Sequence, residues 1–212
     1  MKKLLTALLL SFTIASTAAA SSQISGAERQ DGKLTMKYPV VSLENKKAEQ
    51  KINKHIEKSL VKFQKDAKKS AGLIEGETHY VVHYNDDRHL SFSMIPYIYN
   101  GGAHGMYNEN GYVFDAATGK RLKYTDFIPE LQLEKVRKAI DMGMIKVYST
   151  NSEKPLMNFD TSLLQNISPN FVLKSANTVK LLYQPYVLGS YADGVTCLML
   201  DKATAEKINA LP

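Results

Sequence analysis

Apolar residues recur every three to four positions in one long polar stretch, residues 44–72. They are Ala48, Ile52, Ile56, Leu60, Phe63 and Ala67. This spacing is typical of an amphipathic α-helix whose apolar stripe faces a core. Burial of the four large members would contribute on the order of 1.5 to 3 kcal/mol each, before the entropy of ordering is counted. The pattern therefore predicts a long helix that packs on a sheet.

The period falls from about four to two in the next segment, ETHYVVHYNDDRHLSFSMIPYIY. Alternation indicates strands, and the turn cluster at residues 85–88 separates two of them, which predicts a hairpin. A two-residue loop at Asp86 and Asp87 would fix the register. The expected cross-strand pairs are then His83 with Leu90, Val81 with Phe92 and His79 with Met94. We expect this mainly apolar face to look toward the long helix.

The rest of the chain repeats these signals in shorter form. A second hairpin is predicted at residues 115–119, because alternating residues flank a loop whose glycine suits a left-handed position. A second helix is predicted beyond it, weakened by Gly143. Its apolar side would hold Leu131, Val136, Ile140, Met144 and Val147. Short apolar runs after residue 170 indicate further strands. This order predicts an α+β fold, an antiparallel-rich sheet with two main helices packed on it, as one unit or as two small fused α/β subdomains.

The first 20 residues differ in composition from the rest. Lys2 and Lys3 precede an apolar run at residues 4–14, and small residues follow up to Ala20. This pattern is typical of a secretory signal peptide that is cleaved after Ala20. The run is about ten residues long, shorter than the roughly 20 that a spanning helix needs. We therefore expect an exported protein, periplasmic or extracellular, with no transmembrane helix in the mature chain.

Charge adds a second interpretation of the long helix. Without Lys2 and Lys3 the chain keeps 25 Lys+Arg against 21 Asp+Glu, a net charge of +4, and residues 44–72 hold nine lysines against four acids. A solvated helix face is the ordinary explanation of such lysines. The alternative is a patch for polyanions such as wall polymers or anionic lipid, which long-range fields would attract. Nucleic acid is not an expected partner of an exported protein.

Motifs for catalysis, metal ions or cofactors are missing from the sequence. Cys197, the one cysteine, lies in an apolar strand-like run, where it is expected to be a buried core residue. His79 and His83 would lie roughly 13 Å apart on a strand, too far for one metal ion. The chain has no GxSxG, HExxH or cysteine-rich metal pattern. We therefore expect no metal and no cofactor.

The most unusual stretch is IPYIYNGGAHGMYNENGYVF, in which three glycines bracket one histidine. Glycines permit backbone angles or close approaches barred to other residues, so one interpretation is a tight turn with the imidazole hydrogen-bonded to backbone. The other is a ligand site, because nearby tyrosines offer flat faces with polar tips for stacking on sugars or anchoring a protein. The candidate binding residues are Tyr99, Gly101, Gly102, His104, Gly105, Tyr107, Tyr186, Tyr191 and Asp193.

Three stretches, IYNGGAHGMYN, FDAATGKRLKYTDFI and YQPYVLGSYADG, follow one another in this order. In this respect the chain resembles a family of exported domains of unknown function with a GGAHG signature, and the strand, helix and hairpin before them resemble its usual N-terminal companion domain. These modules form the extracellular lysozyme-binding sensor of the anti-sigma-V factor and the non-catalytic region of some peptidoglycan deacetylases. The resemblance implies an N-terminal module at 21–100 and a C-terminal module at 101–212, which carries the GGAHG and YADG motifs.

Two functions of different class remain. The first is a binding protein of the cell envelope that contacts peptidoglycan, another anionic glycan or a lysozyme-like wall enzyme. A basic lysozyme would meet unfavourable long-range charge, whereas an anionic glycan would not. The alternative is a wall-modifying hydrolase with a cryptic site around His104, which would need two carboxylates, for example from Asp115, Asp126 and Asp193. Clustering of the tyrosines with His104 at one groove would favour binding, and a buried aspartate within its reach would favour catalysis.

Overall fold

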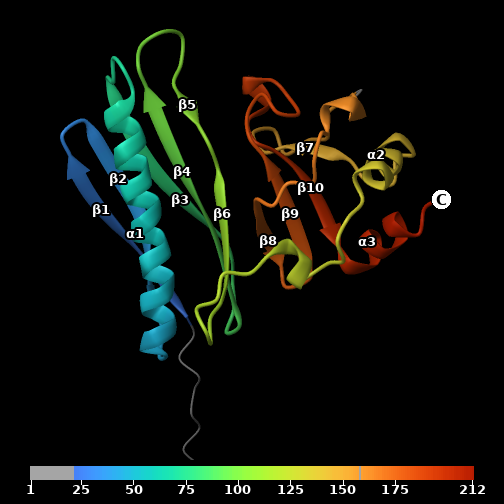
Figure 1. Cartoon of the computed structure of the whole chain (residues 1–212), viewed down its shortest axis with the longest axis horizontal. Coiled ribbons are helices and arrows are strands. Elements are labelled where there is room, and N and C mark those ends of the chain that lie inside the picture. Colours follow the sequence, from blue (N-terminus) through green and yellow to red (C-terminus); the bar gives the residue numbers. More distant parts are fainter. Residues whose placement is uncertain (1–21, 158) are drawn as a thin grey trace, which may run out of the picture.

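The computed structural model describes residues 22–157 and 159–212. The predicted signal peptide, residues 1–20, lies outside them. The described chain forms a six-stranded and a four-stranded sheet, with one long helix on the first and two short helices on the far side of the second (Figure 1). The predicted α+β fold is confirmed. None of the helices in the described part of the chain is both long and apolar enough to cross a membrane.

The first sheet has the strand order β1-β2-β3-β4-β5, and β6 also pairs with β4. The strands are β1 (Gln23–Asp31), β2 (Leu34–Ser42), β3 (Glu75–Asn85), β4 (His89–Tyr99), β5 (Met106–Tyr107) and β6 (Asn110–Asp115). Strands β2 and β3 run parallel, and the other pairs are antiparallel. A parallel pair needs a crossover, which α1 (Lys46–Lys69) supplies.

The long helix α1 forms as its sequence pattern predicts. Asn45 caps it, because the Asn45 side chain accepts hydrogen bonds from the backbone N–H groups of Lys47 and Ala48. The six predicted residues of the apolar stripe are all buried. They pack in one core with strand residues that include Leu90, Phe92, Met94 and Phe114. The helix is therefore held against the sheet along its whole length.

The β3–β4 hairpin has its turn where the sequence predicts it, but the predicted register was wrong. Val82 pairs with Phe92, and Val81 and His79 pair with Ser93 and Ile95. Two features cause the difference. The loop lies one residue further along, at Asp87 and Arg88, because the Asp86 N–H donates to the His89 carbonyl. A β-bulge between Val82 and Tyr84 then adds one residue to β3 and moves the side chains that precede it to the other face. Leu90, Phe92 and Met94 face α1 as predicted, whereas His83 lies against Ser93 on the opposite face.

The second sheet has the strand order β7-β10-β9-β8 and is antiparallel throughout. Its strands are β7 (Val147–Ser149), β8 (Phe171–Ser175), β9 (Thr178–Tyr183) and β10 (Thr196–Asp201), and its helices are α2 (Leu133–Asp141) and α3 (Lys202–Asn209). One face of the sheet shares a core with α2 and α3. The other face holds a small cluster around Val172, Leu182 and Cys197. Cys197 is buried, as predicted, and burial raises the pKa of its thiol to about 11.

The second helix is shorter than its apolar pattern indicates. Helix α2 ends at Asp141, because Gly143 takes a φ of +70° and turns the chain out of the helix. Met144 is therefore exposed, and Val147 belongs to β7. Helix α3 was not predicted, because its eight residues carry only a short apolar pattern.

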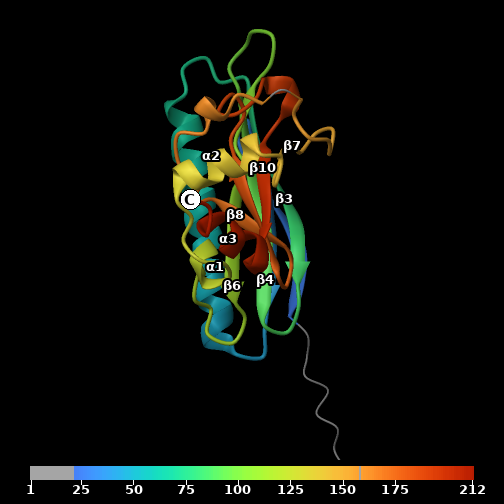
Figure 2. The ribbon, with the colours of Figure 1, turned by 90° about the vertical axis from the view of Figure 1, so that its right-hand side faces the viewer.

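Strands on both sides of residue 100 belong to the first sheet, because β5 and β6 pair with β4. The division of the chain into 21–100 and 101–212 stays a prediction. The second sheet lies against the face of β3, β4 and β6 that is turned away from α1. Figure 2 looks along this stack, with the second sheet and its helices in front of the first sheet. The backbone N–H of Leu173 in β8 donates to the Ser91 hydroxyl of β4 at 2.8 Å. The GGAHG stretch forms the loop between β4 and β5, which pair with each other in the first sheet.

Candidate functional site

The three glycines around His104 have different physical tasks. Gly101 and Gly102 both have a φ of +99°, a conformation that side chains with a Cβ rarely adopt. Gly105 lies under Tyr97, so closely that a Cβ at this position would come within 2.4 Å of a Tyr97 ring carbon. The backbone conformation of the loop therefore explains Gly101 and Gly102, and close packing against Tyr97 explains Gly105.

The imidazole of His104 is bonded to that backbone. Its Nδ1 lies 2.9 Å from the carbonyl oxygen of Gly105, and its Nε2 lies 3.4 Å from the Tyr186 hydroxyl. A carbonyl only accepts hydrogen bonds, so in the neutral ring Nδ1 carries the proton and Nε2 can accept from the phenol. Neither partner is a carboxylate.

Rings from two distant parts of the chain meet His104. Its ring stacks on Tyr191 with centroids 3.9 Å apart, and Tyr107 and Tyr186 each lie with centroids 5.7 Å from the Tyr191 ring. The Tyr191 hydroxyl donates to the Gly105 carbonyl at 2.9 Å. We call these four residues, His104, Tyr107, Tyr186 and Tyr191, the tyrosine–histidine cluster. Burial raises the pKa of the Tyr107 and Tyr191 phenols, so both stay protonated at neutral pH.

The remaining predicted site residues shape the cluster from its edges. Asp193 accepts hydrogen bonds from the backbone N–H and the hydroxyl of Ser190, which holds the 3₁₀ turn Tyr191–Asp193. Tyr99 donates its hydroxyl to the Gly102 carbonyl on the other side of the loop. The structure thus brings His104, Gly105 and three tyrosines together and leaves Tyr99 and Asp193 as supports. Their role in binding a ligand stays a prediction.

The GGAHG loop also forms the end of a longer groove. His104 and Met106 line a hollow of about 320 Å³, and Met106 also lines a neighbouring hollow of about 420 Å³ between α1 and the strands β4 to β6. A third hollow, of about 970 Å³, continues toward the second sheet and shares Tyr112 and Arg121 with the second hollow. We call the three hollows together the α1 groove.

Basic side chains line much of the α1 groove. Lys58 and Lys62 of α1 lie on one wall, and Arg121 and Lys123 lie further along. The Arg121 guanidinium sits over the Tyr112 ring, 4.6 Å from its centroid, and donates to the Gly111 carbonyl at 3.0 Å. Arg121 is thereby fixed where the second and third hollows meet.

The sequence indicates the lysine-rich helix and the GGAHG loop as separate features, and it carries no signal that both line one groove. Lys58 and Lys62 are four residues apart, so they lie on one helix face, and that spacing is a signal the sequence does carry. Arg121 carried no such signal, because its place in the groove depends on the hairpin at residues 115–119. Among the described residues, no group of three or more His, Cys, Asp and Glu is placed to hold a metal ion.

Comparisons with known proteins place this geometry in context. Residues 27–107 match the family model described as Deacetylase PdaC. This stretch reaches from β1 to β5 and includes the GGAHG loop. No curated protein matches the chain in sequence.

Two solved structures share the α+β fold. A DUF3298 family protein from Pseudomonas aeruginosa PAO1 is 14% identical over 87% of this chain and 92% of its own, with a TM-score of 0.57. A DUF3298 family member from Bacteroides fragilis NCTC 9343 is 13% identical over 91% of this chain and 94% of its own, with a TM-score of 0.52. At such low identity the likeness shows the fold alone.

Proposed function

We propose that this chain is an exported binding protein of the cell envelope that holds an extended anionic glycan, peptidoglycan or a polymer attached to it. The observation that carries the proposal is the α1 groove, a row of three hollows in which each neighbouring pair shares lining residues. His104 lies in the first hollow and Lys123 in the third. A linear polymer suits such a groove, because successive units of one chain can occupy successive hollows. A compact ligand would fill only one of them.

The charge of the groove supports an anionic polymer. Lys58, Arg121 and Lys123 face it without a described ion pair, and of its two carboxylates Asp66 is paired with Lys62. The surplus of positive charge along one trough would draw a polyanion toward it. Added salt would screen this attraction, because the lysines are exposed.

His104 is the member of the tyrosine–histidine cluster that lines the end hollow of the α1 groove, and Tyr186 lies beside it. Tyr186 is 57% exposed, so its ring face is open to a ligand beside His104. Flat phenol rings with polar tips are suited to stacking on a sugar and bonding its hydroxyls.

The comparisons support a place in the cell wall. The match to the model described as Deacetylase PdaC covers the GGAHG loop, and the sequence resembles regions that accompany peptidoglycan deacetylases. The leader at residues 1–20 would deliver the chain to the periplasm or outside the cell. In this proposal the modules 21–100 and 101–212 act together, because β5 and β6 of the second complete the sheet of the first.

The two alternatives have less support. A hydrolase centred on His104 needs carboxylates, but its ring is bonded to a carbonyl and a phenol, and Asp193 is engaged with Ser190. A basic lysozyme, the partner implied by the sensor resemblance, would approach the basic groove against repulsion.

The test is co-sedimentation of the protein with purified peptidoglycan at low and moderate salt, beside a pull-down with a basic lysozyme. We expect the protein to pellet with the glycan at low salt, and His104→Ala to pellet less while its circular dichroism is unchanged. His79→Ala is the matched control, because His79 is exposed and distant from the GGAHG loop. Failure of the wild-type protein to pellet would contradict the proposal. Release of soluble glycan fragments would support the hydrolase instead.

A further inference from the structure

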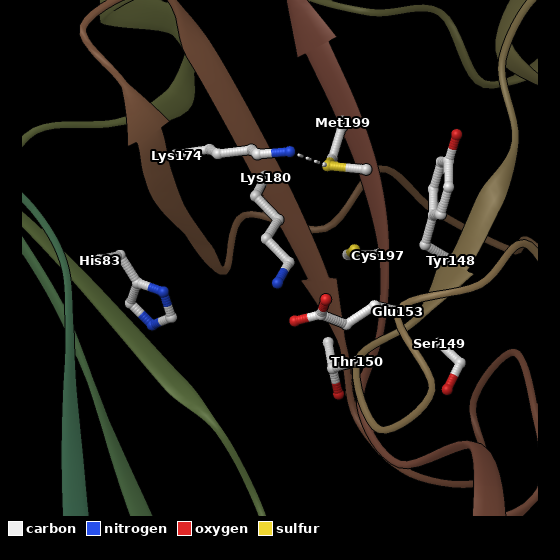
Figure 3. Close-up of a pocket in the computed structure, with 9 residues that line it drawn as sticks. All are labelled: His83, Tyr148, Ser149, Thr150, Glu153, Lys174, Lys180, Cys197 and Met199. Carbon is white, nitrogen blue, oxygen red and sulfur yellow. Dashed lines mark hydrogen bonds between the residues drawn. The ribbon is translucent and has the colours of Figure 1, made fainter.

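A second pocket, the inter-sheet pocket, opens between the two sheets (Figure 3). Its volume is about 320 Å³, and none of its lining residues belongs to the α1 groove. It lies on the face of the second sheet that is turned away from α2 and α3. The inter-sheet pocket is thus separate from the groove that is proposed to bind glycan.

The register of the second sheet builds the floor of this pocket. Met199 on β10 pairs with Lys180 on β9, and Cys197 pairs with Tyr148 on β7, so these side chains lie side by side on one face. Lys174 on β8 extends over them, with its ammonium 3.7 Å from the Met199 sulfur. The floor therefore combines two sulfur atoms and an aromatic ring with two cations. Because burial raises the pKa of the Cys197 thiol to about 11, the sulfur is apolar surface and no nucleophile.

The first sheet supplies the opposite wall through His83. Its Nε2 lies 2.9 Å from the Ser93 hydroxyl and 3.3 Å from a carboxylate oxygen of Glu109, which is buried. Both contacts use the same ring nitrogen, so these three residues do not form a catalytic relay, which needs both nitrogens. They fix His83 as a polar wall.

Neither pocket lysine forms a close ion pair in the described part of the chain, although the charge of Lys180 helps to lower the pKa of the nearby Glu109 carboxyl. Among the ion pairs of the described residues, none involves Lys174 or Lys180. Figure 3 shows the Lys180 ammonium and the Glu153 carboxylate both pointing into the pocket. Glu153 has a φ of +56°, an uncommon conformation for a residue other than glycine that recurs at ligand clamps.

We propose that the inter-sheet pocket binds a small zwitterion with a net negative charge, an acidic amino acid or a short acidic peptide. Lys174 and Lys180 would hold its carboxylates, Glu153 its ammonium group, and the surface of Cys197 and Met199 its carbon chain. Of the charged side chains that line the pocket, two are lysines and one is a carboxylate, so a ligand with two carboxylates and one ammonium group is complementary to them. The volume suits a ligand of this size. The same two ammonium groups would repel a metal cation.

Isothermal titration calorimetry of the full chain tests this proposal, with L- and D-glutamate and the dipeptide Ala-Glu as probes. Succinate, which lacks an ammonium group, free lysine and inorganic phosphate are the comparison ligands. We expect at least one glutamate-type probe to bind more tightly than succinate or phosphate, and lysine to show no binding. Lys180→Gln and Lys174→Gln should each weaken that probe by about tenfold, since each removes a charged contact.

Glu153→Gln should instead reduce the preference for the glutamate-type probe over succinate. Lys154→Gln is the matched control, because Lys154 is an exposed neighbour that does not line the pocket. The proposal is overturned if no glutamate-type probe binds at millimolar concentration, if phosphate binds equally well, or if the control loses as much affinity as Lys180→Gln. Pelleting with peptidoglycan should be the same for Lys180→Gln and the wild type, so failure here leaves the glycan proposal standing.

Discussion

Two residues with unusual backbone angles lie at or beside the regions that are proposed to bind ligands. Tyr186, at a φ of +70°, lies beside His104, and Glu153, at +56°, lies at the inter-sheet pocket. They are the non-glycine residues with positive φ in the described part of the chain. Such conformations cost of order 1–3 kcal/mol and persist where the surroundings hold them. Their positions fit the proposal that both regions bind ligands.

Glu109 should make stability depend on pH. Burial alone would raise the pKa of its carboxyl, but hydrogen bonds from His83 and Ser93, with the charges of His83 and Lys180, outweigh burial and hold this pKa below its ordinary value of 4.5. A lowered pKa in the folded state means that Glu109 stabilises the fold above about pH 4.5 and that this stabilisation is lost as the pH falls through the folded-state pKa.

Urea unfolding of the wild type and Glu109→Gln between pH 7 and pH 3 measures this contribution. We expect the variant to be less stable than the wild type at pH 7, and the difference in unfolding free energy to shrink as the pH falls below about 4.5. A difference that stays constant across this range would show that the Glu109 charge is not stabilised in the folded protein.

Among the single elements, helix α1 contributes both to the core and to the proposed binding groove. One face buries the six residues of its apolar stripe, and the adjacent face presents Lys58 and Lys62 to the α1 groove. Its N-terminus is tied to the second hairpin, because the Asn45 amide donates to the Ala117 carbonyl at 2.7 Å. The position of the groove wall therefore depends on how α1 begins.

Removal of the helix cap should be measurable as a loss of stability. Asn45→Ala deletes the acceptor for two backbone N–H groups and should lower the free energy of unfolding by about 1 kcal/mol. Asn45→Asp keeps an acceptor oxygen and should lose less. Equal stability of Asn45→Ala and the wild type in urea unfolding would show that the cap does not contribute.

Hydrophobic periodicity predicts an element well when only one of its faces is buried. The six apolar residues of α1 are all buried as predicted, because a single face of the helix meets the core. Strand β4 buries both faces, Phe92 toward α1 and Ser91 and Ser93 toward the second sheet, so alternation could not reveal the bulge beside His83. The turn around His104 follows from local glycine chemistry, whereas its ring contacts with Tyr191 depend on tertiary structure.

The whole molecule depends on the junction between its two sheets, which is held by polar as well as apolar contacts. The Ser91 hydroxyl, buried in the first sheet, accepts the Leu173 N–H of the second. The Asn170 side chain accepts the backbone N–H of Gly111 at 2.7 Å, which adds a second polar bond between the sheets. Separation of the sheets would leave these groups without their partners.

Ser91→Ala should weaken this junction. The change leaves a buried N–H without an acceptor and should lower the free energy of unfolding by about 1–3 kcal/mol. Cys197, buried between the sheets, provides a second readout, because its thiol should react with a thiol reagent sooner in the variant. Ser42→Ala, at an exposed site, is the control and should match the wild type.

Two double variants of α1 test whether the α1 groove binds an anionic glycan. Lys58→Gln/Lys62→Gln removes two charges that line the groove, and Lys54→Gln/Lys65→Gln removes two charges from the same helix that do not. The measurement is the fraction of each protein that pellets with peptidoglycan across a salt series. We predict several-fold weaker binding and a shallower salt dependence for the groove variant, and wild-type binding for the other. Equal binding by the two variants at every salt concentration would show that the groove lysines do not hold the glycan.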